Sequence, residues 1–312
     1  MEESKDIRLP LGTVSKSEEL GSYYIDMRPA MVHYEQNIWG GKFDELGVPM
    51  IKVKDAYEYF PINIAQYGFM LHAQWCENED SLTLYKLTQC LSRLEELKDE
   101  GDHICIWWHK FYNEKYDIEP PWASAMAQGE CISFYLRMYQ INGQKSLLRT
   151  AFKAFRFMRD DDPDKGVRRY DSAGYLWLEE YPSNPPSFVL NGFIYALFGL
   201  YDLHRVTKDR EVKADIEQCI NTLKGNISRF DCGYWSIYDL QKKELVRYYY
   251  QLNVHVPQLE VLYQLTGEEI FNDYKQKWEN QATKIGFLIV RIMYRIRPRL
   301  QKIREFFKRC VA

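Results

Sequence analysis

The chain has 312 residues, of which 46% are hydrophobic and 15% are aromatic. This length supports one large hydrophobic core and excludes more than two domains of ordinary size. The net charge of −3 hides an uneven distribution, because residues 280–312 carry nine basic side chains and one acidic side chain, a net charge of +8 that leaves −11 on the rest. Such asymmetry indicates an anionic partner for the C-terminal segment, either a membrane or a nucleic acid.

The predicted secondary structure is mostly helical. Residues 1–45 lack helical periodicity and predict an extended segment packed on the body. Asp80 and Ser81 can cap a helix that ends at Gly101. The apolar stripe of this helix consists of Leu84, Leu87, Leu91 and Leu94. We expect further helices over 62–75, 123–140, 145–159, 187–205, 209–227, 254–266 and 268–281. Strand-like alternation is limited mainly to the first 60 residues and to 230–250.

Polar residues recur at a fixed position in these helices. Gln66, Gln128 and Asn191 each lie early in a predicted helix, have a glycine within two residues and follow one or two prolines, and the next step along the chain reaches His255. The period of 62 to 64 residues suits two helices with their connections. The alternative is a chance alignment of amide residues.

The repeat predicts a mainly α fold, an incomplete α/α toroid of helical hairpins with a short irregular or β N-terminal segment. Its inner helices would begin at one rim and direct polar side chains at a central cleft. We expect residues 1–45 to form the N-terminal segment, residues 46–283 the toroid and residues 284–312 a basic amphipathic helix.

Common cofactor and metal motifs are missing from the sequence. The six histidines form no HxxxH pair, and no nucleophile elbow, phosphate loop or dinucleotide fingerprint occurs. We therefore predict no metal site and no cofactor. The acidic run at 160–164 is typical of a solvated turn, with calcium binding as the lesser alternative.

Polar aromatic residues concentrate in three segments at the expected rim, namely 57–60, 170–181 and 234–250. Aromatic faces stack on sugar rings, and a phenol adds a directed hydrogen bond. Core packing explains any one of these side chains, but three clusters before successive inner helices favour a carbohydrate-binding cleft.

Several long strings in these segments resemble the C-terminal helical domain of D-glucuronyl C5-epimerases. They are YFPINIAQYG at 59–68, EPPWASAMAQG at 119–129, EEYPSNPPSFVLNG at 179–192, YDL at 201–203, IYDL at 237–240 and HVPQL at 255–259. The resemblance covers roughly residues 20 to 280 and implies an α/α toroid that inverts C5 of glucuronate to iduronate within a glycan, without a redox cofactor.

The resemblance also implies which residues act. The catalytic candidates are Glu180, Tyr181, Tyr238 and, from the run at 248–250, Tyr250. The expected substrate-binding residues are Tyr59, Gln66, Tyr67, Trp122, Gln128, Arg169, Asn191, Arg247 and His255.

Two positions depart from the family pattern. Gln241 stands where an arginine typically follows the Tyr-Asp-Leu string, so that Arg169 and Arg247 become alternative partners of the substrate carboxylate. The last catalytic tyrosine normally stands four residues before the histidine that matches His255, where this chain has Gln251. A one-residue insertion or bulge would restore Tyr250, with Tyr249 as the alternative.

These residue types suit the reaction. The C5 hydrogen lies next to a carboxylate and is weakly acidic, so inversion needs a base on one face and an acid on the other. Glu180 can be the base if burial raises its pKa, and a tyrosine can serve in either role. Donors or a cation must hold the carboxylate as charge develops on the intermediate, and inner-helix N-termini would add positive potential.

The C-terminal segment has apolar residues at helical spacing with arginines and lysines between them, and Pro298 should kink the helix. The apolar positions are Ile289, Ile292, Met293, Ile296, Leu300, Ile303, Phe306 and Phe307. This pattern is typical of a helix lying on an anionic membrane, which favours a membrane over a nucleic acid. Docking on the acidic body and a contact within a homodimer are the alternatives.

The cysteine pattern and the first thirty residues bear on the expected location. The seven cysteines are odd in number and contain no CxxC pair, which fits a reducing compartment. No apolar run follows a basic start in the first thirty residues, and the apolar stretch 285–294 is too short to span a bilayer. We expect a cytoplasmic protein, peripheral at the inner membrane face, that acts on a glucuronate-containing polysaccharide resembling heparosan or on a lipid-linked oligosaccharide. A uronate lyase and a non-catalytic glycan-binding protein are the alternative functions.

Overall fold

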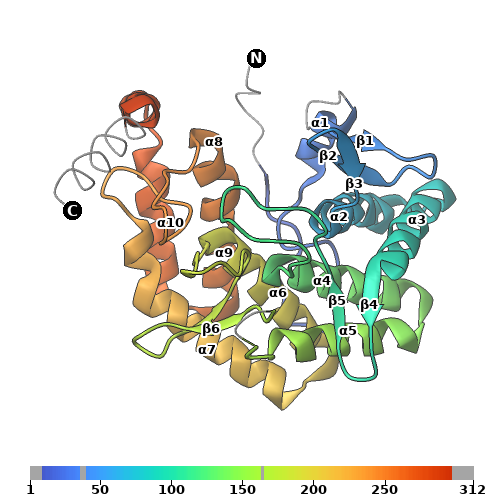
Figure 1. Ribbon diagram of the computed structural model, residues 1–312. Helices are drawn as coiled ribbons and strands as arrows, with labels where there is room; N and C mark the ends of the chain where they lie inside the picture. Colours follow the sequence, from blue (N-terminus) through green and yellow to red (C-terminus); the bar gives the residue numbers. More distant parts are fainter. Residues whose placement is uncertain (1–8, 36–39, 163–164, 297–312) are drawn as a thin grey trace.

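Helical hairpins make up most of the chain. In the computed structural model, which describes residues 9–35, 40–162 and 165–296 apart from the Glu35 and Tyr248 side chains, four hairpins follow one another around a common centre (Figure 1). They are α2 (Pro61–Asn78) with α3 (Ser81–Leu97), α4 (Ala125–Asn142) with α5 (Lys145–Met158), α6 (Leu190–Thr207) with α7 (Arg210–Asn226), and α9 (Val256–Thr266) with α10 (Glu269–Gln281). The first helix of each hairpin is the inner one, and α4 packs between α2 and α6. This incomplete α/α toroid confirms the predicted fold class.

Inner and outer helices differ in the surface that they bury. Every residue of α4 from Ala125 to Met138 is buried, as is every residue of α6 from Leu190 to Leu200. A helix covered on all sides shows little amphipathic pattern. The outer helix α5 buries a single stripe that includes Leu147, Ala151 and Ala154. The weak amphipathic periodicity of α4 and α6 in the sequence therefore reflects their position in the inner ring.

Aspartate side chains cap the N-termini of two outer helices. The Asp80 carboxylate accepts a hydrogen bond from Thr83 N at 2.9 Å, as expected for the N-cap of α3. The expected end at Gly101 is wrong, because α3 stops at Leu97 and the chain continues as a strand. In α7, the Asp209 carboxylate accepts from the amides of Glu211 and Val212.

Short antiparallel strands line the gaps between hairpins. β1 (Lys42–Phe43), β2 (Pro49–Val53) and β3 (Ala56–Glu58) form one sheet, while β4 (Lys98–Glu100) pairs with β5 (Cys105–Trp107) and β6 (Arg168–Tyr170) pairs with β7 (Leu176–Leu178). The last two pairs lie outside the segments expected to hold strands, and the described part of 230–250 contains isolated bridges instead. β5 and β7 are buried throughout, so they lack the alternation that sequence analysis requires.

The segment before the toroid was expected to be extended, but the structure shows that part of it is helical. It forms a 3-10 turn at Arg28–Ala30 and the short helix α1 (Met31–Glu35). Upstream, Tyr23 and Tyr24 are fully buried, and the Tyr23 ring stacks on Phe69 of α2 with the centroids 3.8 Å apart. Apolar burial therefore attaches this segment to the inner helices.

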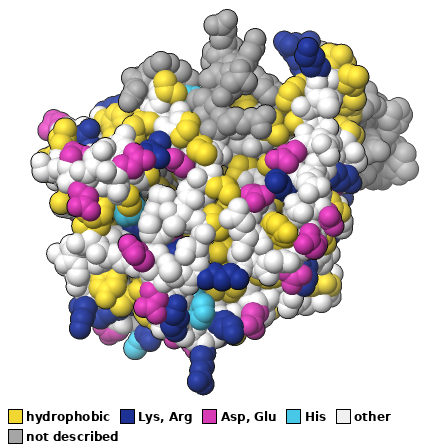
Figure 2. Space-filling view, turned by 180° about the vertical axis from the view of Figure 1, so that it is seen from behind, with side chains coloured by type: hydrophobic (Ala, Val, Ile, Leu, Met, Phe, Trp, Pro, Cys, Tyr) yellow, Lys and Arg dark blue, Asp and Glu magenta, His cyan; other side chains and the backbone are white. Residues whose placement is uncertain are grey.

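Residues 284–296 form a further helix after α10. On the face shown in Figure 2, acidic and basic side chains are interspersed, and hydrophobic side chains lie beside basic ones near the grey C-terminal residues. Among the described residues, none of the helices has the length and apolar character needed to cross a membrane.

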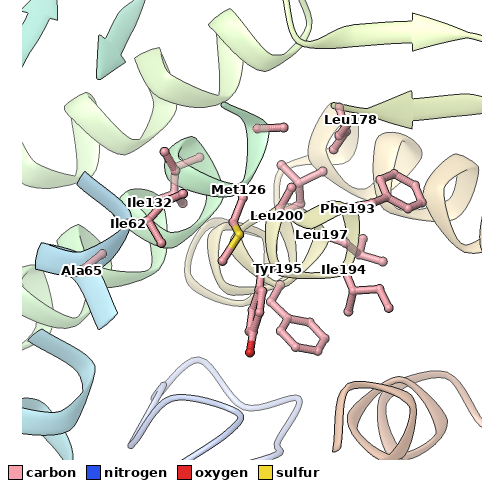
Figure 3. Close-up of a cluster of buried hydrophobic side chains, with 14 of the residues drawn as sticks. Ile62, Ala65, Met126, Ile132, Leu178, Phe193, Ile194, Tyr195, Leu197 and Leu200 are labelled. Atoms are coloured by element: carbon pink, nitrogen blue, oxygen red, sulfur yellow. The ribbon is translucent and has the colours of Figure 1, made fainter. Parts of the chain in front are cut away.

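The core lies where the inner helices meet. Figure 3 shows buried side chains from α2, α4, α6 and β7 packed against one another, including Ile62, Met126, Leu178 and Phe193. The polar cluster described below lies at the ends of these inner helices, so the core holds its backbone in place.

Candidate active site

Loops that precede two inner helices converge at one end of the toroid. Glu180 and Tyr181 follow β7 and precede α6, whereas Tyr238 belongs to the loop before α9. The two loops are joined by backbone hydrogen bonds, including one from Leu190 N to Tyr238 O at 3.1 Å. Residues 58 positions apart in the sequence thereby come into contact.

Glu180 is the centre of this cluster. Its side chain is buried, and the Tyr238 hydroxyl donates to it, with Oη 3.2 Å from Oε1 and 3.3 Å from Oε2. Gly192 provides the space, because a Cβ at that position would lie 2.2 Å from Glu180 Oε2. Burial raises the pKa of Glu180 to about 7, although hydrogen bonds from Tyr181 and Tyr238 and the charge of Lys115 act in the opposite direction.

Three tyrosines border the carboxyl group and keep their protons. Burial, together with the nearby Glu180 charge, holds the pKa values of Tyr181, Tyr238 and Tyr250 well above the ordinary value. The rings of Tyr238 and Tyr250 meet edge to face, with the centroids 5.9 Å apart. At neutral pH the cluster therefore combines a titratable carboxyl group with neutral phenols.

A π-helix lies between Tyr250 and His255, where the sequence has one residue more than the family pattern. Residues Gln251–His255 adopt this conformation between α8 (Tyr248–Tyr250) and α9, and a π-helical turn accommodates one residue more than an α-helical turn. The Tyr250 ring thereby lies against both Tyr238 and His255, whereas the Tyr249 hydroxyl accepts a hydrogen bond from Arg247. The Gln251 side chain joins two segments of the fold, because Oε1 accepts a hydrogen bond from Ser236 N and Nε2 donates one to Trp278 O.

Buried polar groups of α6 and α9 continue the cluster. His255 is completely buried, burial lowers its pKa to about 3, and its Nδ1 lies 3.0 Å from Ser236 Oγ. Among the described residues, His255 Nε2, Asn191 Oδ1 and Gln258 Oε1 have no hydrogen-bond partner. Buried polar atoms of this kind are usually satisfied by a partner, so a bound water or a polar ligand would complete their hydrogen bonds.

Another buried carboxyl group lies between α4 and α2. Glu130 is fully buried and accepts a hydrogen bond from Gln66 Nε2 at 3.0 Å. Burial raises its pKa well above the ordinary value, and the charge of Glu180 adds to this shift. Glu130 is therefore close enough to the cluster for the two carboxyl groups to influence each other.

The other predicted substrate-binding residues have contacts elsewhere. Tyr59 donates to Asp44 at 2.7 Å, and Tyr67 packs between Tyr34 and Phe43. The Gln128 side-chain amide bonds to the backbone of β5 through both of its polar atoms: Oε1 accepts from Trp107 N, and Nε2 donates to Cys105 O.

Trp122 lies closer to the cluster, because it stacks on His109 and its ring is 5.7 Å from that of Tyr181. The two expected carboxylate partners make other bonds: Arg169 donates to the carbonyls of Asp162 and Arg168, and the exposed Arg247 donates to Tyr249.

The loop between β5 and α4 contributes residues that sequence analysis missed. Tyr116 stacks on Tyr181 with the centroids 4.7 Å apart and donates to the buried Asp239 at 3.2 Å. Lys115 Nζ lies 4.3 Å from the centre of the Tyr238 ring. A signal was available, because Phe111, Tyr112, Tyr116 and Trp122 form a fourth aromatic cluster before an inner helix, at the position that the repeat implies. Within the described ranges, no group of three or more His, Cys, Asp or Glu side chains could hold a metal ion.

Comparisons with known proteins place these observations in a family. Residues 101–280, which include all four catalytic candidates, match the family described as D-glucuronyl C5-epimerase C-terminus. Over 186 residues the chain is 34% identical to the D-glucuronyl C5-epimerase of Caenorhabditis elegans, which covers 54% of this chain and 30% of the nematode protein. It is 28% identical over 200 residues to an uncharacterized protein of Methanocaldococcus jannaschii, covering 63% of this chain and 64% of that protein.

The chain thus spans less than two thirds of the length of either relative. A GH76 α-mannanase of Bacteroides thetaiotaomicron shares the fold, with a TM-score of 0.50 and 9% identity over 78% of this chain and 63% of the mannanase.

Proposed function

The chain belongs to the D-glucuronyl C5-epimerase family, and on this basis we propose that it inverts C5 of D-glucuronate to L-iduronate within a glycan. The hydrogen bond from Tyr238 to the buried Glu180 carries the proposal. A carboxyl group with a pKa of about 7 is partly ionised at neutral pH and can accept a proton, while the neighbouring phenols, with raised pKa values, can donate one. Environments that separate the pKa values of two groups in this way distinguish a base from an acid.

The proposed reaction begins with the weakly acidic C5 hydrogen. Glu180 removes this proton, the C5–H bond breaks, and its electron pair moves into the adjacent carboxylate to give an enolate-like intermediate. Tyr181 or Tyr250 then donates a proton to the opposite face of C5. The resulting phenolate regains a proton from Glu180 through the hydrogen-bonded tyrosines or from solvent. Buried donors arranged around the intermediate lower its energy because they need no reorganisation.

Deuterium exchange tests this proposal. The protein is incubated in heavy water with oligosaccharides of alternating glucuronate and N-acetylglucosamine. We expect deuterium at C5 and some iduronate, both lost in Glu180→Gln and Tyr238→Phe. Tyr263→Phe is a matched control, because this tyrosine lies on α9 and bonds to Glu269 instead. Full exchange in both active-site variants would contradict the assignment.

The same experiment separates the alternatives. A lyase would begin with the same proton abstraction but would then expel the 4-linked sugar, leaving an unsaturated uronate that absorbs in the far ultraviolet. Binding without any exchange would indicate a glycan-binding protein.

We further propose that the protein works at an anionic membrane surface on the cytoplasmic side. The helix at 284–296 has two apolar faces. Phe287 and Val290 pack on the body, whereas Ile285, Leu288 and Ile292 are 71%, 57% and 45% exposed. Lys284, Arg291 and Arg295 flank the exposed face, and further basic residues follow in the sequence. Exposed isoleucines between basic side chains suit the interface of an anionic bilayer.

The location of this helix supports the proposal. The Tyr294 hydroxyl donates to the carbonyl of Leu245, which follows Glu244, the ion-pair partner of Lys115. A bilayer at this helix would therefore lie near the rim of the cluster, where a lipid-linked glycan could reach it. Residues 297–312, which include the predicted kink at Pro298, lie outside the described residues.

Vesicle sedimentation tests membrane binding with the full chain. Because Phe287 and Val290 pack on the body, substitution of the exposed face is a cleaner test than deletion. Ile285→Gln combined with Ile292→Gln should abolish sedimentation with vesicles of phosphatidylglycerol and phosphatidylcholine. The control changes Leu82 and Tyr85 to Gln, since these α3 side chains are also exposed, at 62% and 52%. Unchanged vesicle binding in the helix variant would contradict the proposal, and so would a dimer in solution that only the helix variant disrupts.

A further inference from the structure

The cluster presents an electrostatic problem to an anionic substrate. Glu180 and Asp239 are both buried within it, and a uronate would bring another carboxylate to the same place. Like charges at short distance in a water-poor site repel strongly. Substrate binding therefore requires a cation that can reach the sugar carboxylate.

Lys115 lies in a suitable position. Its ammonium group lies over the face of Tyr238, 4.3 Å from the ring centre, and over Tyr116 at 5.2 Å. Its side chain is 38% exposed, so a ligand entering from solvent can contact it. The charge of Lys115 also acts on the cluster, because it lowers the pKa values of Glu180 and Asp239.

Other cations near the cluster are less suitable. Arg169 bonds to backbone carbonyls of its own region, and Arg247 bonds to the Tyr249 hydroxyl. Lys242 lies 5.5 Å from the centre of the Tyr116 ring, on an exposed turn. Gln241, which is uncharged, donates to Pro185 O and Ser183 Oγ.

The partner of Lys115 can be replaced. Glu244 Oε2 lies 2.7 Å from Lys115 Nζ, but the Glu244 side chain is 50% exposed. Ion pairs at such exposure contribute little free energy, so an incoming carboxylate can compete with Glu244. The long, flexible stem of lysine allows the ammonium group to move from one carboxylate to the other.

We infer that Lys115 binds the substrate carboxylate, exchanging Glu244 for the uronate when a glycan enters the site. The inference rests on the proposed function. The carboxylate is bonded directly to C5, so a sugar whose C5 hydrogen meets Glu180 and Tyr238 presents its carboxylate to the residues beside Tyr238. The same ammonium group then stabilises the charge that moves onto the carboxylate as the C5–H bond breaks.

Kinetics of substitutions at Lys115 test the inference. With the glucuronate oligosaccharides, Lys115→Met should raise KM about tenfold or more, because a charge-assisted hydrogen bond is lost. Lys115→Arg should retain most of the affinity, and Glu244→Gln should lower KM by releasing the lysine. Lys110→Met is the matched control, because this exposed lysine lies on the same loop. Oligosaccharides with the carboxylate reduced to an alcohol should bind the wild type and Lys115→Met equally.

A pH profile gives a readout that a purely structural lysine would not change. The charged or titratable groups acting on Glu180 include Tyr181, Tyr238, Lys115 and Asp239. Because Lys115 lowers the pKa of Glu180, its removal should raise that pKa and move the acid limb of kcat/KM to higher pH.

The outcomes separate the inference from the proposed function. If the wild type exchanges deuterium and Lys115→Met keeps the same KM and pH profile, the inference is wrong and the function stands. If binding depends on both the sugar carboxylate and Lys115 but no exchange occurs, the inference holds and the function is wrong. A wild-type protein that binds none of these oligosaccharides would contradict both.

Discussion

Buried charged or titratable side chains lie near both ends of the inner helices α4 and α6, but their ion-pair and hydrogen-bond partners differ between the two ends. Toward their C-termini, Asp202 of α6 pairs with Arg137 of α4 at 2.6 Å and with Arg205 at 3.2 Å, all three buried. The arginines also donate to backbone carbonyls of the N-terminal segment, at Gly21 and Ser17. Each charge has several partners, and the network attaches that segment to the toroid.

Near their N-termini the same helices border Glu130 and Glu180, whose hydrogen-bond donors are neutral amide and hydroxyl groups. Burial raises the pKa of both groups as a result. A buried charge with full partners thus stabilises the fold, whereas a buried acid with neutral partners has a raised pKa. Four predictions test this difference.

The largest effect should follow removal of the shared carboxylate in the paired network. Asp202→Ala leaves two buried arginines without their partner, so we expect the free energy of unfolding to fall by about 3–5 kcal/mol. Urea denaturation measures this loss. Glu211→Ala is the control, because its ion pair with Arg159 is exposed and its removal should cost less than about 1 kcal/mol. Equal losses in the two variants would show that the network does not anchor the N-terminal segment.

Near the N-termini of α4 and α6, Glu180→Gln should instead raise the free energy of unfolding. The pKa of Glu180 is about 7 in the folded protein, above its ordinary value of 4.5. The unfolded chain therefore loses this proton at lower pH than the folded one, and wild-type stability falls as pH rises toward and through 7. Glutamine does not titrate, so between pH 4 and 8 the variant should gain up to about 3 kcal/mol relative to the wild type. Urea denaturation across this range checks the slope, and a pH-independent difference would contradict the raised pKa.

Two glycines near the N-termini of α4 and α6 allow a related comparison, between a contact with backbone and a contact with the buried acid. A Cβ on Gly129 would lie 2.6 Å from Ala196 Cα, in the backbone of α6, whereas a Cβ on Gly192 would meet the Glu180 side chain. Gly129→Ala should therefore reduce stability by about 1–3 kcal/mol through overpacking. Gly192→Ala should reduce deuterium exchange about 10–100-fold by displacing the carboxyl group, with a smaller loss of stability. Each variant is the control for the other, and reversed effects would contradict the roles assigned to the two glycines.

The sequence predicted the helices well because their signals are local. Asp80 caps α3, prolines precede the inner helices, and the outer helices show a clear apolar stripe. β5 and β7 were missed because each is three residues long and buried throughout, without alternation. The family strings pointed to Glu180 and Tyr238, whereas the spacing before His255 left Tyr249 and Tyr250 as alternatives, and the π-helix became visible only in the structure.

Partners across the toroid could not be predicted in the same way. The contact of Lys115 with Tyr238 joins residues that are distant in the sequence, and it depends on how the loop before α4 folds over the loop before α9. The pairing of Glu130 with Gln66 likewise depends on the packing of α4 against α2. Propensity and periodicity give the position of each element along the chain, but these contacts depend on the three-dimensional packing.

The smallest effect should come from Glu130→Gln, and it tests whether a buried acid without a cation is neutral. Burial raises the pKa of Glu130 well above the ordinary value and so favours the protonated side chain, which resembles glutamine in shape and charge. The free energy of unfolding should change by less than about 1 kcal/mol at pH 6, as expected for a near-isosteric exchange. Glu130→Ala is the matched control, since it leaves a cavity and should cost about 2 kcal/mol or more. If Glu130→Gln were as destabilising as Glu130→Ala, the hydrogen bond from Gln66 would require an ionised carboxylate, and Glu130 would belong with the paired charges of the opposite end.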